Sequence, residues 1–333
     1  MRSPSFSLLP RIALLLSILP AALPGQNGDL QRAIKLFEDR NYPAARSELS
    51  AVLARDGRDA KALYYMGRIA IADNQSAEAI GWFEKAVKAD DTSSQYHLWL
   101  ANALGQEAQR ASKFRQPFLA RRVKSEFERA VQLDPRSVDA RRGLMDFYLI
   151  APGVMGGSKE KARAQAAEIV KISPLQGRFA TAAIAQREKD APAAEREYVA
   201  AVTENPDSAI AYLALSVYYQ NTQRWDEAFA VLDRLLAVKP NEVRAHYQIG
   251  RAAALSGKHL DRGEQSLKLW IAKPPDDAVV TTRSGAHYRL GMVYDKQGKR
   301  DLARAEYEQA LRINARNEDA RKALEKLKAE SRG

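Results

Sequence analysis

The side chains that could support metal or covalent chemistry are few and scattered. The four histidines, at positions 97, 246, 259 and 287, form no His-x-x-x-His pair and no local cluster with carboxylates, so we predict no metal site. The chain has no cysteine, which excludes disulfides, thiolate metal ligands and a cysteine nucleophile. A nucleophile elbow and a dinucleotide-binding glycine fingerprint are also missing. We therefore expect no enzymatic activity and no cofactor.

A glycine-containing turn at residues 152–159 is the most distinctive local segment. Backbone N–H groups near Gly156 and Gly157 could hold an anion at the start of the following helix, and Lys159 would add charge. The Gly-x-x-x-x-Gly-Lys-Ser/Thr order of a nucleotide-binding loop is missing, and no strand precedes the turn. The alternative is that the glycines serve only to allow positive φ angles. The sequence leaves both interpretations open.

Residues 106–124 form a basic segment with one acid, Glu107. Its cations are Arg110, Lys113, Arg115, Arg121, Arg122 and Lys124. The segment, with Arg121 and Arg122 as its adjacent pair, could contact an anionic partner, and the alternative is a solvated helix surface. Pro117 is expected to start a helix within it.

The elements that must position these residues recur about every 34 residues. Prolines that end a helical pattern are separated by 39, 32, 34 and 34 residues; they are Pro135, Pro174, Pro206, Pro240 and Pro274. A short sequence motif, a Tyr followed three residues later by Gly, also recurs at residues 63–67, 246–250 and 287–291. Polar turns follow it, in which Gly or Asn can take the left-handed conformation that closes a helix. These turns lie at residues 73–75, 221–223 and 296–299.

This pattern resembles the tetratricopeptide repeat (TPR), a pair of helices called A and B. The eighth repeat matches best, through His287, Leu290, Gly291, Tyr294, Ala303, Tyr307 and Ala310. The resemblance covers about residues 27–330 and implies an all-α, right-handed superhelical solenoid of about eight helix-turn-helix repeats and a C-terminal capping helix. The repeats are expected at about 26–59, 60–93, 94–136, 137–174, 175–208, 209–242, 243–279 and 284–316, with the cap at 317–328.

The spacing of small and large residues has a physical cause. Small residues are needed where the two helices of one repeat cross, as at Gly67 with Ala79. Large residues such as Phe83 are expected to fill the gap to the neighbouring repeat. The third and fourth repeats are longer than the others, and we expect their extra residues in the turn between helices A and B.

The resemblance also places a partner-binding surface in the concave groove of the solenoid, on the A helices. The residues at its groove positions are Lys61, Tyr64, Arg68, Arg142, Arg244, Tyr247, Arg251, Tyr288 and Met292. Tyr and Arg together suit capture of a protein or peptide segment, including an acidic one, and nucleic acid is not expected as a partner. The alternative is a solvated inner face whose tyrosines pack on adjacent helices. The Lys-Asn carboxylate clamp of some family members is not evident.

The N-terminus has the pattern of a secretory signal peptide over residues 1–25. Arg2 and Arg11 supply positive charge, an apolar run follows, and small residues allow cleavage after Ala22 or Gly25. No later segment approaches about 18 consecutive apolar residues, so we expect no membrane span in the mature chain. The predicted location is the bacterial periplasm; the alternatives are an N-terminal anchor in the inner membrane, or secretion.

The net charge of +11 favours anionic partners in general, unless the basic residues serve only to keep the solenoid soluble. The sequence therefore predicts a non-catalytic scaffold or adaptor of the cell envelope. The alternative is a periplasmic binding component for an anionic polymer or small solute held within the superhelix.

Overall fold

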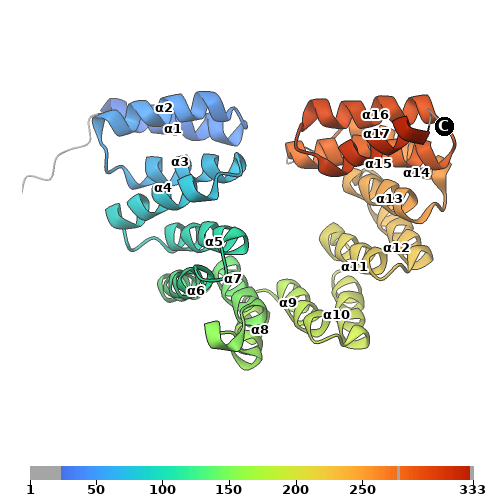
Figure 1. Ribbon diagram of the computed structural model, residues 1–333. Helices are drawn as coiled ribbons and strands as arrows, with labels where there is room; N and C mark the ends of the chain where they lie inside the picture. The colour runs from blue at the N-terminus through green and yellow to red at the C-terminus, as the bar shows by residue number, and fades with distance from the viewer. Residues whose placement is uncertain (1–23, 276–277, 331–333) are drawn as a thin grey trace, which may run out of the picture. The chain divides into compact units, whose positions relative to one another are not determined.

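Helices make up nearly all of the structure. The computed structural model describes residues 24–275 and 278–330, and these form seventeen α-helices and one short 3-10 turn, without a β-strand among them (Figure 1). The prediction of an all-α repeat fold is confirmed. Residues 1–23 of the predicted signal segment (residues 1–25) lie outside the described residues. The chain divides into two compact units, with the boundary after Pro135.

The first unit holds three helix-turn-helix pairs, in which each A helix packs against the B helix that follows it. The helices are α1 (Pro24–Glu38), α2 (Tyr42–Arg55), α3 (Ala60–Ala72), α4 (Ser76–Ala89), α5 (Ser94–Arg110) and α6 (Gln116–Leu133).

The second unit holds five pairs and a final single helix. The pairs are α7 (Val138–Ile150) with α8 (Lys159–Ile172), α9 (Pro174–Arg187) with α10 (Ala191–Glu204), α11 (Ala209–Asn221) with α12 (Trp225–Val238), α13 (Val243–Ser256) with α14 (Leu260–Ala272), and α15 (Val280–Lys296) with α16 (Arg300–Ile313). Helix α17 (Glu318–Glu330) packs on α16 and buries Ala320, Leu324 and Leu327, while most of its other side chains are exposed. It therefore covers the last apolar surface as a capping helix does.

The turns inside the repeats contain a residue at positive φ, except for the turn of the third repeat at residues 111–115. Asn74 and Gly298 take this conformation as predicted. In the turn after α11, the residue at positive φ is Gln223 and not Asn221, because Asn221 is still the last residue of α11. Pro174 also differs from the other prolines, since it begins α9 directly after Ser173. Proline is tolerated there because the first N–H groups of a helix have no partner within it.

Helices A and B approach closely where an A-helix glycine faces a large B-helix side chain. A Cβ atom added to Gly67 would lie 2.5 Å from the ring of Phe83, and one added to Gly291 would lie 2.5 Å from the ring of Tyr307. The glycine thus makes room for an aromatic ring of its own repeat, so Phe83 is not only a filler between repeats. Ala79, the other small residue predicted at this crossing, is fully buried.

The extra residues of the third repeat do not form a long turn. They lengthen α5 to 17 residues and α6 to 18, against 13 and 14 in the preceding pair. Only residues 111–115 connect them, and Pro117 lies in the first turn of α6 as predicted. The fourth repeat does carry its extra residues between its helices, as a 3-10 turn at Gly153–Met155.

Candidate partner-binding surfaces

One open groove in the second unit runs along α11. Ile210, Leu213 and Val217 lie three and four residues apart, so they share one face of the helix, and Ile210 is 51% exposed. The groove has a volume of about 360 Å³. We call it the α11 groove; its lining residues are Gln186, Tyr198, Ile210, Leu213, Ala214, Val217, Tyr218 and Asn221. This groove was not predicted from the sequence, although its apolar residues occupy the same helix positions as the predicted Tyr and Arg residues.

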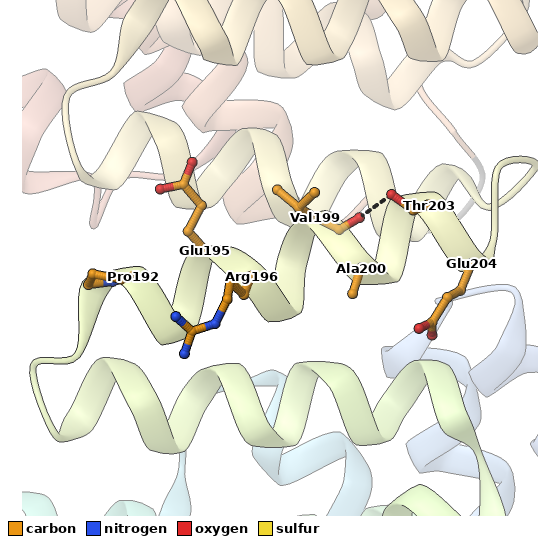
Figure 2. Close-up of a pocket in the computed structure, with 7 residues that line it drawn as sticks. All are labelled: Pro192, Glu195, Arg196, Val199, Ala200, Thr203 and Glu204. Carbon is orange, nitrogen blue, oxygen red and sulfur yellow. Dashed lines mark hydrogen bonds between the residues drawn. The ribbon is translucent and has the colours of Figure 1, made fainter.

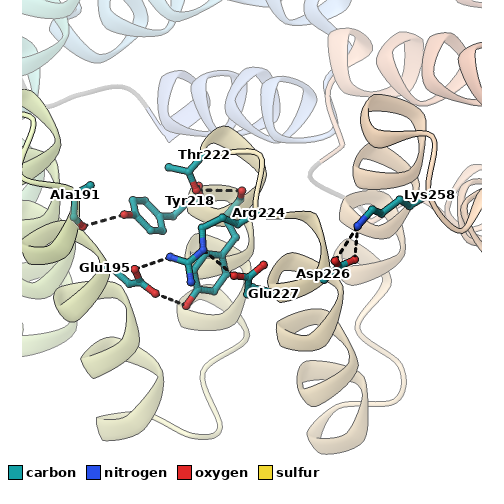
Figure 3. A network of polar contacts seen from close by, with 9 residues as sticks. Ala191, Glu195, Tyr218, Thr222, Arg224, Asp226, Glu227 and Lys258 are labelled. Carbon is teal, nitrogen blue, oxygen red and sulfur yellow. Dashed lines mark hydrogen bonds and ion pairs between the residues drawn. The ribbon is translucent and has the colours of Figure 1, made fainter.

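Two tyrosines support the α11 groove. The rings of Tyr198 and Tyr218 are 5.1 Å apart, and the Tyr198 hydroxyl donates a hydrogen bond of 3.1 Å to Gln186 Oε1. The Tyr218 hydroxyl donates to the carbonyl of Ala191 at 2.9 Å, which joins α11 to the start of α10 (Figure 3). The groove is therefore held in shape before any partner arrives, which lowers the entropic cost of binding.

An ionic network fixes the neighbouring side of α11. Glu195 accepts hydrogen bonds from Arg224 Nη1 at 2.6 Å and from the Tyr219 hydroxyl at 3.0 Å, and Arg224 Nε donates to Glu227 at 2.8 Å (Figure 3). Burial raises the pKa of Tyr219 to about 12, and the bond to Glu195 adds to this. The bond from Arg224 lowers the pKa of Glu195. These charges are paired with one another, so the network positions helices and leaves little charge for a partner.

A shallow hollow on α10 lies close to this network. It holds about 520 Å³, and Thr203 Oγ1 donates to the Val199 carbonyl at 3.0 Å along it (Figure 2). Its lining residues are Pro192, Glu195, Arg196, Val199, Ala200, Thr203 and Glu204. Both carboxylates are already paired, Glu195 with Arg224 and Glu204 with Arg178. The hollow is therefore a weaker candidate site than the α11 groove.

Arg251 lies at the end of the α11 groove. Its guanidinium donates to Gln220 Oε1 at 2.8 Å and to Asn221 Oδ1 at 3.2 Å, and Asn221 lines the groove. Burial lowers the pKa of Arg251, and the nearby charge of Arg289 lowers it further. Both hydrogen-bond partners are neutral amides. Among the described residues, no carboxylate forms an ion pair with the Arg251 guanidinium, so this end of the groove carries an unpaired positive charge.

Arg289 of α15 is the second cation at this place. Its guanidinium carbon lies 5.8 Å from the centre of the Tyr247 ring, and its buried Nε has no hydrogen-bond partner within the described part of the chain. Tyr247 in turn packs against Trp270 at 5.2 Å. We call Arg251 and Arg289 the arginine pair. The structure thus brings together the predicted Tyr247 and Arg251 and adds Arg289, which the sequence analysis did not name.

The other predicted residues of the second unit differ in their surroundings. Arg244 forms an ion pair with Glu242 two residues away, at 2.8 Å. Arg142 donates to Gln176 at 3.3 Å. Tyr288 and Met292 are partly buried against the apolar core around α15, with the Tyr288 ring 5.9 Å from that of Tyr307. The structure therefore does not gather these four residues into the site formed by the α11 groove and the arginine pair.

In the first unit, Arg68 lies among aromatic rings. Its guanidinium carbon is 3.8 Å from the centre of the Trp99 ring and 5.2 Å from that of Phe37, and its Nη1 donates to the Tyr64 hydroxyl at 2.7 Å. Tyr64 is only 2% exposed, so it packs and orients Arg68 and offers little contact area itself. Lys61 is exposed on the same helix. Arg68 remains available to a partner because it is only partly buried.

The glycine turn of the fourth repeat uses its own backbone groups. Gly156 has φ +98°, and its N–H and that of Gly157 donate to the carbonyls of Gly153 and Pro152 at 2.9 and 3.1 Å. The next N–H, of residue 158, donates to the Tyr148 carbonyl at 2.9 Å. These donors are already used within the turn. The positive φ accounts for Gly156, while at Gly157 a Cβ would lie 1.8 Å from the Ala151 carbonyl oxygen.

The cations proposed for anion contact differ in their partners. Lys159 has a 63% exposed side chain and lies 4.0 Å from Glu188. Arg122 forms an ion pair with Glu84 at 2.5 Å, while the neighbouring Arg121 is exposed and has no ion pair within the described residues.

Two histidines form pairs that the sequence did not reveal. His97 Nδ1 lies 2.6 Å from Glu126, and His287 Nδ1 lies 2.7 Å from Glu306. Each pair joins the A and B helices of one repeat. Burial acts to lower the pKa of His97, but the hydrogen bond to Glu126 and that to the Asp91 carbonyl outweigh it, so the pKa is raised. Among the described residues there is no group of three or more potential metal ligands.

Comparisons with known proteins agree with this architecture. Three family models described as tetratricopeptide repeat match residues 30–94, 185–254 and 284–317, which together make up about half of the chain. A tetratricopeptide repeat protein from Parabacteroides merdae has a similar structure, with a TM-score of 0.52 and 11% identity over 80% of this chain and 98% of that one. No curated protein matches in sequence.

A thermophilic TPR protein from Thermus thermophilus is also similar, with a TM-score of 0.44 and 17% identity over 68% of this chain and 98% of that one.

No helix in the described part of the chain is long and apolar enough to cross a membrane. Stacked helical repeats of this kind generally serve as protein-interaction scaffolds. The matched repeats and the helix pairs that contain them show that the chain is a member of the tetratricopeptide repeat family.

Proposed function

We propose that this protein is a non-catalytic scaffold of the bacterial cell envelope that binds an extended partner segment on the A-helix face of its second unit. The observation that carries the proposal is the arrangement of the α11 groove and the arginine pair. Asn221 lines the groove and also accepts a hydrogen bond from Arg251, so the apolar and the cationic parts of the surface are continuous.

This arrangement selects a partner by its chemistry. Ile210, Leu213 and Val217 offer an apolar strip to apolar side chains. A carboxylate that follows them would reach Arg251, whose present partners are neutral amides. A charge-assisted hydrogen bond to such a group contributes about 1.5–3 kcal/mol. The partner segment is therefore expected to carry apolar residues followed by an acidic one.

The envelope location rests on the sequence of residues 1–25, which has a charged start, a short apolar run and a small-residue exit. A chain without cysteine has no disulfides to form after export, which suits the periplasm. Cell fractionation of the expressed chain tests this part. Recovery of the uncleaved protein in the cytoplasm would remove the envelope from the proposal and leave the scaffold function in place.

Partner capture from envelope extract tests the scaffold function. The wild-type chain should retain a partner that Ile210→Ser loses, because this change removes exposed apolar surface from the groove without touching the core. Arg251→Gln should also weaken binding and should make it less sensitive to salt. Arg244→Gln is the matched control on the same helix, since Arg244 is paired with Glu242 and its loss should leave binding unchanged.

Two outcomes would contradict this assignment. Capture that is equal for the wild type and for Ile210→Ser and Arg251→Gln would place the partner site elsewhere. Calorimetric binding of a polyanion or a small solute, with no protein captured, would favour the binding-component alternative.

A further inference from the structure

The connection between α5 and α6 and the first turns of α6 expose two phenylalanines, and we call residues 111–121 the α5–α6 turn. Phe114 is 90% exposed and Phe118 is 73% exposed, and they are the only large apolar side chains so exposed in the described part of the first unit. Phe37, Tyr64 and Trp99 of this unit instead pack together around Arg68. Large apolar side chains in full contact with water are unfavourable, and neighbouring ones commonly mark a contact surface.

The surroundings of these two rings are cationic. Residues 108–125 contain six Lys or Arg side chains and no acid. Lys113, Arg115 and Arg121 are exposed and have no ion pair among the described residues, and Arg110 donates only to the neutral side chain of Asn74, at 2.6 Å. Only Arg122 and Lys124 have carboxylate partners nearby. The exposed rings therefore lie next to positive charge that no protein group neutralises.

This combination fits a surface that is anionic outside and apolar beneath. Lys and Arg bind the head groups of anionic phospholipids, and aromatic rings insert at the boundary between head groups and acyl chains. A soluble polyanion would satisfy the cations but would offer no apolar phase to the rings. An apolar pocket of a protein would accept the rings but would not require the three unpaired cations.

We propose that the α5–α6 turn docks this protein reversibly on an anionic phospholipid surface, through Phe114 and Phe118 together with Lys113, Arg115 and Arg121. This docking site goes beyond the proposed scaffold function and does not depend on it, because it lies in the first unit and uses none of the residues of the α11 groove. Two inserted rings and three cations give weak and reversible attachment, unlike a membrane-spanning helix.

Vesicle co-sedimentation of the purified protein tests the proposal. Binding is expected to vesicles of phosphatidylglycerol and phosphatidylcholine and not to vesicles of phosphatidylcholine alone. The double variant Phe114→Ser/Phe118→Ser should reduce the partition coefficient by about tenfold or more. Each of Lys113→Gln, Arg115→Gln and Arg121→Gln should reduce it by about fivefold at low salt.

The matched control is Arg58→Gln/Lys88→Gln, which removes two exposed charges elsewhere in the first unit and should leave the partition unchanged. All variants share the same N-terminal segment, so any contribution of that segment to binding cancels. Both phenylalanines are exposed, and circular dichroism should show an unchanged helical content in their variants.

Three results would overturn the proposal. The first is the absence of binding to either kind of vesicle. The second is binding that survives the loss of both phenylalanines, because it would then be general electrostatic attraction. The third is a protein partner whose capture requires Phe114 and Phe118 while vesicle binding does not, which would make the turn a protein-docking site.

Discussion

The packing of Gly67 against Phe83 leads to a quantitative prediction. An added Cβ at Gly67 would lie 2.5, 2.7 and 2.8 Å from three ring atoms of Phe83. The ring is fully buried, and its centre lies 6.0 Å from that of Tyr64 and 6.3 Å from that of Trp99, so it has little room to move. Gly67→Ala should therefore destabilise the α3–α4 pair, although alanine is the better helix former.

The size of the effect follows from two opposing contributions. Alanine in place of glycine inside a helix stabilises by about 1 kcal/mol. Overpacking of a close-packed core costs about 1–3 kcal/mol, and three contacts this short lie at the upper end of that range. The expected net loss is about 1–2 kcal/mol. Gly81 of α4 is the matched control, because an added Cβ there meets no atom within 4 Å. Gly81→Ala should therefore stabilise by about 0.5–1 kcal/mol.

Hydrogen exchange of the α3 and α4 amides is the suitable assay, because a repeat protein of two units need not unfold in one step. Protection should fall in Gly67→Ala, rise in Gly81→Ala, and recover when Gly67→Ala is combined with Phe83→Leu. Equal gains of protection in the two single alanine variants would refute the reasoning. They would show that the Phe83 ring yields at no cost and that glycine is not required at position 67.

Three further predictions concern other contacts. The pKa of His97 is raised in the folded state, so its bond to Glu126 stabilises the fold below about pH 6.5, and this stabilisation is lost as the pH rises through the folded pKa. The stability difference between the wild type and His97→Gln in chemical denaturation should therefore be larger at low than at high pH, and a difference that grows with pH would contradict this assignment. Gly157→Ala places a Cβ 1.8 Å from the Ala151 carbonyl oxygen and should lower the melting temperature while partner binding persists; Gly153→Ala, which meets no atom within 4 Å, should change the melting temperature little. Asn317 caps α17 through the Ala320 N–H and donates to the buried Ser284 hydroxyl at 2.8 Å, so Asn317→Ala should cost about 1–2 kcal/mol in chemical denaturation, and an unchanged midpoint would show that neither bond matters.

The sequence alone determined the repeat and the start of α6. A helix pair depends on local propensity, on capping residues and on contacts with its immediate neighbours, so its signals recur within about 34 residues. Pro117 and the helix-closing Asn74 and Gly298 were predictable for the same reason, because each acts on its own stretch of backbone. The helix ends were less predictable where several polar residues compete, as at Asn221 and Gln223.

The tertiary structure decided which of the polar and aromatic residues remain open to a partner. Arg251 and Arg244 lie on the same helix, yet Arg244 is paired with Glu242 while Arg251 contacts only neutral amides from α11. Likewise, Phe83 is fully buried and Phe114 is 90% exposed. The contacts of Arg251 and of His97 depend on side chains that come together from separate helices, 31 and 29 residues apart in the sequence. A local pattern therefore identifies the scaffold, and only the packed helices show which surfaces on it are free to bind.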